Sequence, residues 1–501
     1  MMQSPNSLQQ VVGLLSTVYE DILHNAIRLI LENGISTSHV KLLEKAGNSP
    51  AIKVRENRMV PEENLIKETL RNIKKYNFPS DHHTRQYHGW FDSIFPSPDF
   101  QGLMIRINDR AYCYADHTNR TFHPLTRKEC VDGTKLIHVL HQQYGVKGYA
   151  CGTPQEAPEL LKGIEQYLIG YRYNTLGGST EVPATSELLD DFLNIREIAE
   201  SEFNRKSMDI AVWSPSPLRL ESDELNLLFY PGIGIQRILI GSMPIMGLSG
   251  PVDPVGVFTL ALAETLGGAT IIHALFPEIQ VFIMPHPQPM DLGTGMIAFG
   301  TIEHLRLELI KTGLFSFLDL PYAMVKDTLT SAHMPDFLCQ ADKMLYISTA
   351  IMHGVSAFSI CPVSCDEGWN PVQCILDVEY IRNVWELFQI GSVEKRAEEA
   401  LLTTHRAITE KCMFAEMEDT LLNMFQYYNT DRLLGRQFGF QKWKESGFPD
   451  PFRTAEDRVS EMLRNWDYIP PEKQWFDIHR IYLSLCKKFQ TSPMDFIGDK
   501  M

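Results

Sequence analysis

The residues best placed for chemistry lie in loops that are rich in Gly, Pro and small polar side chains. Three loops share this composition: residues 214–217, 244–251 and 285–300. Trp213 stands just before the first loop, and the longest loop carries His286, Asp291 and Phe299. Loops of this kind let the backbone approach a ligand closely. Gly and Pro also simply end strands, but three such loops after successive apolar runs favour a shared pocket.

Short apolar runs, separated by stretches of helical period, must position these loops. The runs predict strands at residues 146–150, 209–213, 238–243, 281–284, 322–325 and 357–361, with 173–176 and 372–376 as further candidates. Helices are expected between them at residues 188–203, 254–266, 303–312 and 335–352. Repeated strand–helix alternation predicts a parallel sheet with right-handed crossovers. Eight strands over about 230 residues predict an α/β fold, a closed (β/α)8 barrel whose functional loops follow the carboxyl ends of its strands.

The segments on either side of this barrel predict extensions. Helices are expected within residues 8–46 and 61–76, and a β-hairpin within 102–115 that turns at Asn108 and Asp109. The pattern after residue 400 is mainly helical, in 394–412 and 456–466. We therefore predict an N-terminal extension of helices and a hairpin at 1–145, the barrel at 146–400 and a C-terminal helical extension at 401–501.

Net charge, cysteine pattern and apolar stretches indicate which ligands and which compartment suit this chain. The chain has 46 Lys and Arg against 62 Asp and Glu, a net charge of −16, which disfavours nucleic acid and is compatible with a small cationic ligand. The nine cysteines are scattered without the spacing of a secreted disulfide framework, which predicts a reducing, cytoplasmic compartment. The first residues lack the pattern of a signal peptide, and no apolar stretch is long and unbroken enough to predict a membrane span.

Other chemistries find little support in the residue pattern. His353, Cys361 and Cys365 invite a zinc site, but their spacing matches no closed zinc pattern, and buried structural cysteines fit their apolar neighbours better. Gly232 and Gly234 lack the third glycine of a dinucleotide-binding motif and precede a strand instead of following one. The Gly-x-Ser-x-Gly and Walker A patterns are also absent, which argues against a hydrolase or an ATPase.

A succession of short matches along nearly the whole chain resembles the trimethylamine methyltransferase family. The matching residues are the segment 244–251, Met290, Asp291, Gly295, Phe299, Gly300, Thr301 and Glu303, the segment 327–331, Pro335, Asp336, Gln340 and Gly354, then Asp377, Glu379, Asp431, Arg432, the segment 443–447 and the segment 453–455. The N-terminal helix that ends at Gly34 also fits.

The resemblance implies a (β/α)8 barrel that moves a methyl group from a methylated amine to the cobalt of a separate corrinoid protein. The corrinoid, a cobalamin, would then belong to the partner, and this chain would bind and aim the substrate without a cofactor or metal of its own. Founding members of the family use pyrrolysine to activate trimethylamine, and this sequence contains none. Relatives without it are expected to act on quaternary amines such as betaines or carnitine, whose permanent charge already makes the amine a leaving group.

A quaternary ammonium has no N–H to donate, so aromatic faces and carboxylates must recognise it. The aromatic candidates for substrate binding are Trp213, Phe299, Tyr322 and Phe358, and the carboxylate candidates are Asp291 and Asp327. His286, or Lys326, is a candidate partner for a substrate carboxylate. Each has a structural alternative: core packing for the aromatics, a helix cap for Asp291, a surface position for His286 and a salt bridge for Lys326. No residue is assigned a catalytic role.

The chain departs from the family pattern in two places. Relatives carry a Gly-Gly-His-Phe-like turn where this chain has residues 411–418, which contain no glycine and predict continuous helix. Relatives often show a histidine at the end of the strand that begins near Gly354, where this chain has Cys361 and Pro362. These departures motivate an alternative function, a catalytically inactive member that binds a methylated amine or the corrinoid protein. A homo-oligomer is compatible with either function.

Overall fold

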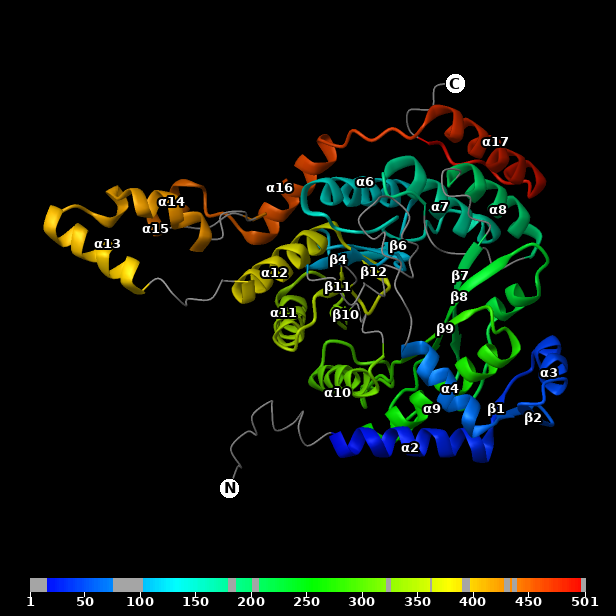
Figure 1. The fold of residues 1–501 in the computed structure, drawn as a ribbon. Helices are drawn as coiled ribbons and strands as arrows, with labels where there is room; N and C mark the ends of the chain where they lie inside the picture. The colour runs from blue at the N-terminus through cyan, green and yellow to red at the C-terminus, as the bar shows by residue number, and fades with distance from the viewer. Residues whose placement is uncertain are drawn as a thin grey trace.

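The protein is a mixed α/β molecule whose elements are arranged around two parallel three-stranded sheets (Figure 1). The computed structural model describes residues 16–74, 102–178, 186–200, 207–320, 326–360, 363–389, 397–427, 433–434 and 439–496. The predicted strand at 322–325, with Tyr322, lies outside these residues, and so does Cys361.

The first parallel sheet has the order β7-β8-β9 and confirms three predicted strands. It consists of β7 (Ser207–Ser214), β8 (Gly234–Ser242) and β9 (Gln280–Pro285). Helix α9 (Pro254–Leu275) connects β8 to β9 and packs against both. Its amino end is fixed by Asp253, which accepts a hydrogen bond from Gly256 N, and by Pro254 in the first turn. The carboxyl ends of all three strands therefore meet at one edge of the sheet.

The second parallel sheet has the order β10-β11-β4 and corrects the predicted hairpin. It consists of β10 (Lys326–Asp327), β11 (Ala357–Ile360) and β4 (Met104–Ile107). Residues 102–115 form no hairpin because β4 pairs in parallel with β11, some 250 positions later in the chain. The local turn signal at Asn108 and Asp109 was outweighed by this long-range pairing. The parallel sheet thus takes a strand from before residue 146.

Three other predicted strands differ from the structure. Residues 146–150 make only a single parallel bridge, between Lys147 and Arg106 of β4. Residues 173–176 begin at the end of a helix and continue as a turn, and 372–376 lie inside a helix. Short apolar runs do not distinguish a buried strand from a buried helix, which explains the error at 372–376. Among the described residues no strand pairing joins the two parallel sheets, so a closed ring of strands is not seen there.

Two smaller sheets flank the parallel ones. β5 (Cys113–Asp116) pairs with β6 (Thr121–Pro124) as an antiparallel hairpin, and β12 (Gly368–Trp369) pairs in parallel with β5. Because β5 follows β4 and β12 follows β11, this sheet is built from the loops after two neighbouring strands. β1 (Ile35–Ser36), β2 (Ile52–Arg55) and β3 (Arg58–Pro61) form the other.

Most predicted helices are present with shifted ends. The helices besides α9 are α2 (Ser16–Asn33), α3 (Val40–Gly47), α4 (Glu63–Lys74), α6 (Arg127–Tyr144), α7 (Lys162–Tyr173), α8 (Ser186–Ala199), α10 (Ile302–Leu318), α11 (Phe337–Met352), α12 (Pro371–Gln389), α13 (Ala397–Glu410), α14 (Glu418–Tyr427), α15 (Phe440–Glu445), α16 (Pro451–Arg464) and α17 (Glu472–Lys488).

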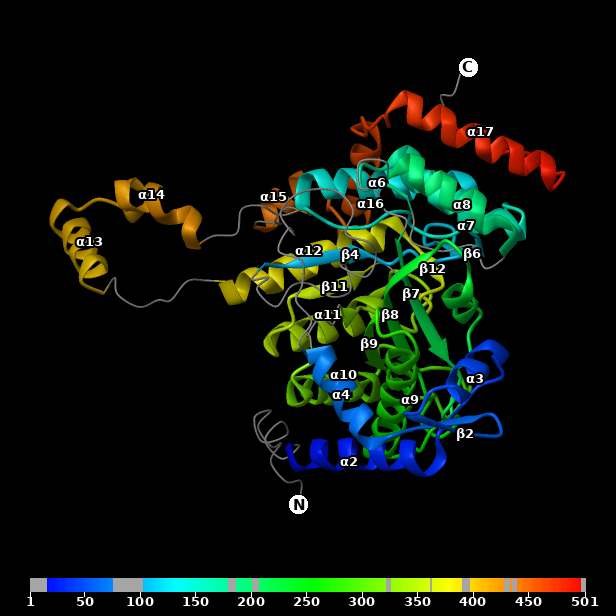
Figure 2. The ribbon, with the colours of Figure 1, turned by 45° about the vertical axis from the view of Figure 1, so that its right-hand side comes forward.

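The prediction of continuous helix through residues 411–418 is wrong. Helix α13 ends at Glu410, Lys411 has a left-handed backbone with φ 52°, and α14 starts only at Glu418. Figures 1 and 2 show α13 and α14 projecting together away from the rest of the molecule.

Among the described residues, two large hydrophobic cores hold the body together, and each is assembled from distant segments. One joins α2 and α4 to β7, β8, β9 and α9, and the other joins β4, α6 and α7 to β11, α12, α16 and α17. Within the described part of the chain, α9 is the one helix long and apolar enough to span a membrane by length and composition, but 89% of its apolar window is buried in the first core. That burial is typical of a central core helix.

Candidate functional site

Trp213 lies at the carboxyl end of β7 over the backbone of β8. In the register Trp213 pairs with Gly241, which in turn pairs with Met284 of β9, so these positions share one face of the sheet. A Cβ atom on Gly241 would come within 2.5 Å of the Trp213 ring, so only glycine leaves room for the indole there. The indole remains 36% exposed, which makes it an aromatic surface that a ligand can reach.

His286 follows β9 and lies beside this indole. The two rings are 6.3 Å apart between centroids and meet edge to face at 70°. The Lys311 Nζ lies 2.7 Å from His286 Nδ1, and because an ammonium only donates, Nδ1 must accept. The neutral imidazole therefore carries its proton on Nε2, where it is a donor. His286 is only 15% exposed at its side chain, so the alternative of a surface histidine is wrong.

A buried network extends from His286 to Phe299. Lys311 forms an ion pair with Glu308 on α10, and the Tyr346 hydroxyl donates to the Glu308 carboxylate over 3.1 Å. The Tyr346 ring stacks on His304 at 5.5 Å, and His304 meets Phe299 edge to face at 5.3 Å. A charge pair this deeply buried is stable only when both partners and their hydrogen bonds are retained. Trp213, His286 and Phe299, all predicted from the sequence, thus belong to one continuous cluster.

Glu264 of α9 is a second buried charge under the same edge. Its carboxylate accepts hydrogen bonds from Ser216 Oγ and Leu218 N in the loop after β7, and from Ser242 Oγ at the end of β8. Burial raises the pKa of Glu264 above its usual value, although these three hydrogen bonds act in the opposite direction. Glu264 therefore ties the loop after β7 to the end of β8, and His286 N continues the connection by donating to Ser242 O.

Gln288 adds an unsatisfied polar group two residues after His286. Its side chain is fully buried, and within the described part of the chain its amide oxygen has no hydrogen-bond partner. Buried polar atoms are nearly always paired, which makes this acceptor an exception in the interior.

Asp327 lies at the edge of the other parallel sheet. It ends β10, and its charge, together with burial as the larger cause, raises the pKa of Asp366 in the loop after β11. Arg110, in the loop after β4, opposes this shift from 3.8 Å. Two carboxylates and a guanidinium thus follow the ends of three neighbouring strands. Lys326 has its backbone in β10, and its side chain is outside the described part.

Asp291 is exposed in the long loop after β9, and its carboxylate stabilises the turn that it begins. Its carboxylate accepts hydrogen bonds from Thr294 Oγ1, Thr294 N and Gly293 N at 2.8, 2.7 and 3.1 Å, which lower its pKa. The alternative that Asp291 caps the following helix is wrong, because Thr301 caps α10 by accepting from His304 N.

Phe358 lies in the second hydrophobic core. It is in the centre of β11, between β10 and β4, with no exposed surface. Core packing is therefore the structural role of Phe358, and a ligand at the surface has no access to its ring.

The loops at the carboxyl ends of the strands are joined in the order of the strands. Backbone and side-chain hydrogen bonds link Met246 N to Gln288 O, Ser331 Oγ to Phe299 O, Cys365 N to Thr330 O, Tyr112 N to Glu367 O and Thr153 N to Ala111 O. These bonds connect the loops after β8, β9, β10, β11 and β4 and the segment after Lys147. The hydrogen bond between Ser331 and Phe299 links the two parallel sheets, which no strand pairing joins within the described residues.

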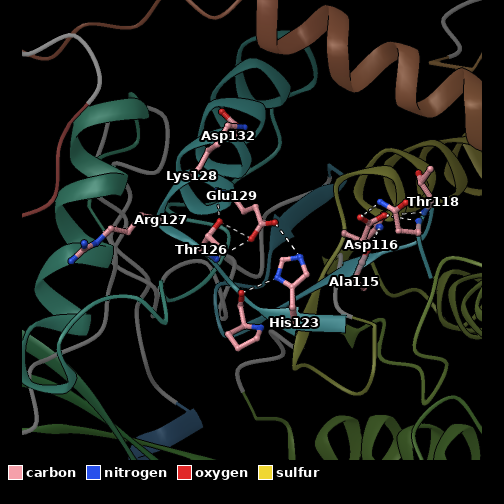
Figure 3. A network of polar contacts seen from close by, with 12 residues as sticks. Ala115, Asp116, Thr118, His123, Thr126, Arg127, Lys128, Glu129 and Asp132 are labelled. Carbon is pink, nitrogen blue, oxygen red and sulfur yellow. Dashed lines mark hydrogen bonds and ion pairs between the residues drawn. The ribbon is translucent and has the colours of Figure 1, made fainter. Parts of the chain in front are cut away.

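A further polar network beside β6 has a structural role (Figure 3). His123 points to the Glu129 carboxylate, 3.4 Å from Nε2, and its Nδ1 is 3.0 Å from Pro124 O. Glu129 also completes a capping box with Thr126 at the start of α6. The hydrogen-bonding groups of these residues pair with one another and hold β6 against α6. We therefore assign them a structural role.

Sequence reasoning missed four polar residues of the site: Glu264, Glu308, Lys311 and Tyr346. Signals for three were present, because Glu264 is the one acidic residue of a 22-residue, nearly apolar helix, and Glu308 and Lys311 stand three apart on another helix. A buried charge pair at such spacing shares one helix face.

The zinc alternative gains no support. Across the described ranges no group of three or more His, Cys, Asp or Glu side chains is close enough to hold a metal ion. Cys361, one of the three residues considered, lies outside them.

Comparison with known proteins gives one family. A family model described as "Trimethylamine methyltransferase (MTTB)" matches residues 191–473, more than half of the 501 residues. A solved structure described as the crystal structure of the hydroxylamine MtmB complex is similar at 11% identity and a TM-score of 0.42, over 90% of this chain and 87% of that chain. No curated protein matches.

Proposed function

This chain belongs to the trimethylamine methyltransferase family, and from that premise we propose that it moves a methyl group from a quaternary amine to the cobalt of a separate corrinoid protein. Membership implies methyl transfer between a methylamine and a corrinoid protein. The quaternary character of the amine is our addition. It rests on the exposed Trp213 indole beside a buried, hydrogen-bonded charge network.

Trp213 is the single observation that carries this proposal. A quaternary ammonium is recognised by the faces of aromatic rings, of which Trp is the strongest, and each contact contributes about 0.5–2 kcal/mol. The indole is held by Gly241 and by the edge contact with His286, so it is oriented before a ligand binds. Preorganisation of this kind saves the entropy of ordering a side chain on binding.

The neighbouring polar groups fit the rest of a betaine-like substrate. His286 would pair with a substrate carboxylate as a donor from Nε2, because Lys311 fixes Nδ1 as the acceptor. If the barrel closes, Asp327 and Asp366 would supply negative charge from the second sheet.

The proposed reaction needs no proton. The bond between nitrogen and the methyl carbon breaks, its electron pair stays on nitrogen, and a neutral tertiary amine leaves. The partner's cobalt, when present, supplies the nucleophile that receives the methyl group. The residues of this chain bind the cation, orient one methyl group outward and exclude water from it.

We also propose that the strands close into a (β/α)8 barrel formed mainly by residues 146–400 and completed by β4, with the rest of 1–145 as an N-terminal extension and 401–501 as a helical extension. The support is the sequence of parallel neighbours β7-β8-β9 and β10-β11-β4, extended by the bridge from β4 to Lys147. The hydrogen-bonded loops bridge the gap between β9 and β10 through Ser331. Such a barrel would bring both groups of site residues to one rim.

Partners and location complete the proposal. We expect a methylated amine and a corrinoid protein as partners, neither nucleic acid nor a membrane, and a cytoplasmic location. The eight cysteines in the described ranges are free thiols, which suits a reducing compartment.

The test mixes purified protein with a reduced corrinoid carrier and a panel of trimethylamine, betaines and carnitine. We expect loss of one methyl group from a quaternary amine, followed by NMR, together with a change in corrinoid absorbance. Trp213→Leu should raise KM about 2- to 30-fold, the range of one cation–π contact. Phe476→Leu, at an exposed aromatic of α17, is the matched control and should leave KM unchanged.

The competing function is a binder that does not turn over. Thermal stabilisation by a quaternary amine without loss of a methyl group would favour it over the enzyme. The missing Gly-Gly-His-Phe-like turn, which motivated this alternative, argues for it less strongly now. Residues 411–418 do turn, through Lys411, despite the absence of glycine. No response to any member of the panel would remove the quaternary-amine proposal altogether.

A further inference from the structure

Helix α11 exposes a long apolar face on the surface of the body. The face repeats every three and four residues, through Leu338, Ala341, Leu345, Ser348 and Met352. Leu338, Leu345 and Met352 are 58, 49 and 59% exposed, and Phe337 beside them is 85% exposed. Alternate spacings of three and four are the pattern by which one helix packs along another. No charged residue interrupts this face, which we call the α11 seam.

The projecting helix α13 carries a matching face. Leu401, Thr404 and Ile408 follow the same spacing, and all three are exposed, with Leu401 at 58% and Ile408 at 68%. Met413 and Phe414, just beyond the helix, are also more than half exposed. Ala407 is the one buried residue among the described side chains of α13. A 14-residue helix without tertiary packing is marginal in water, so α13 needs a surface to cover its apolar face.

The two faces do not meet within this chain. Figures 1 and 2 agree that α13 projects away from the body, well apart from α11. A second copy of the chain, related by a twofold axis, offers both faces again, so α13 of each copy can lie on α11 of the other.

We propose that the protein forms a dimer by exchanging these arms, with α13 of each copy seated along the α11 seam of its partner. The area is sufficient. Two such contacts cover on the order of 1,500 Å² of exposed apolar side chains, within the range of stable, specific interfaces. The absence of charge along both faces favours burial, because an uncompensated charge there would oppose it.

The first experiment is sedimentation of the full chain at micromolar concentration. The wild type should sediment at twice the chain mass of 57.2 kDa. Leu345→Glu in the seam and Ile408→Glu in the arm should each weaken the dimer more than about 100-fold, because each buries an unpaired carboxylate. Ile469→Glu, at a 76% exposed position outside both faces, is the control and should remain dimeric. Circular dichroism verifies that every variant is folded.

Mixing the two disrupted variants tests the exchange itself. The Leu345→Glu chain retains an intact arm and the Ile408→Glu chain an intact seam, so their mixture should recover a heterodimer held by one contact. Seam-to-seam or arm-to-arm pairing predicts no recovery and would overturn the proposal. A monomeric wild type would overturn it as well, whether the arm then folds back on its own chain or waits for a different protein.

Discussion

Glu264 shows how a single residue can couple stability to pH. Its carboxylate is buried under the ends of β7 and β8, where three donors hold it. Burial dominates, so its pKa is raised above the usual 4.5. The folded state therefore holds this proton more tightly than the unfolded state. Stability from this group is greatest at low pH and falls as pH rises from about 4.5 through the folded pKa.

Glu264→Gln should remove this decrease while keeping the shape. The amide oxygen can accept from Leu218 N, and the amide nitrogen can donate to the two serine hydroxyls. Relative to wild type, the variant should gain stability in urea unfolding as pH rises above about 4.5, the usual pKa of a glutamate. Glu278→Gln, at an exposed glutamate, is the control. A difference between the variant and wild type that is constant with pH would refute the assigned cause.

Lys311 neutralises the buried Glu308 and supports His286. Lys311→Met should lower the free energy of unfolding by about 3–5 kcal/mol, because it leaves Glu308 charged and buried. Adding Glu308→Gln should recover part of the loss, since the remaining group is neutral and can still accept from Tyr346. Chemical denaturation measures both. A double variant no more stable than the single would show that the charge of Glu308 is not the source of the loss.

At the scale of elements, the register of β7 against β8 positions the indole that we assign to cation binding. Trp213 and Gly241 are paired neighbours, and glycine is required there because a side chain would occupy the space of the ring. Strand β8 therefore contributes to the site because Gly241 has no Cβ atom. The position of the indole depends on how β7 pairs with β8, and neither strand would fix it alone.

Gly241→Ala should displace the indole and raise KM for the quaternary amine about 2- to 30-fold, as Trp213→Leu does. The two changes together should have little more effect than either one, since both remove the same contact. Gly163→Ala in α7, where an added Cβ meets no atom within 4 Å, should leave KM unchanged. If the effects of Gly241→Ala and Trp213→Leu on KM were fully additive, Gly241 would not act through the indole.

At the scale of the whole molecule, two cores are each assembled from remote segments. Ile22 of α2 is fully buried in the core that contains β7, β8 and β9. Tyr482 of α17 is fully buried in the other core, where its hydroxyl donates to Glu165 and accepts from Met494 N, both over 2.8 Å. If the loops at the strand ends join the two halves into one barrel, the cores should unfold together.

Ile22→Ala should lower the free energy of unfolding by about 2–4 kcal/mol and Tyr482→Phe by about 1–3 kcal/mol. Both should shift one common transition, seen alike by Trp fluorescence and far-UV circular dichroism. Two separate transitions, each responding to only one substitution, would contradict a single barrel.

Local patterns were sufficient for part of the fold and of the site. The apolar runs of β7, β8 and β9 and the loops after them could be read directly, and these segments include Trp213, His286 and Phe299, which the structure brings into one cluster. The hairpin at Asn108 failed because β4 pairs with β11, and no short-range signal encodes a partner some 250 positions away. Phe358 and Trp213 looked equivalent as aromatics near strand ends, yet one is fully buried and the other a third exposed.

Local sequence is enough to assign strands and helices where hydrophobic period and caps agree, and to locate the loops that carry polar and aromatic groups, because these features depend on neighbouring residues. Long-range contacts are needed to leave Trp213 accessible and to place Lys311 and Glu308 behind His286. The tertiary structure also shows that the Asp291 carboxylate is held by hydrogen bonds within its own turn. Burial and charge pairing depend on atoms that the chain brings together from distant positions, and so they arise only when the fold is complete.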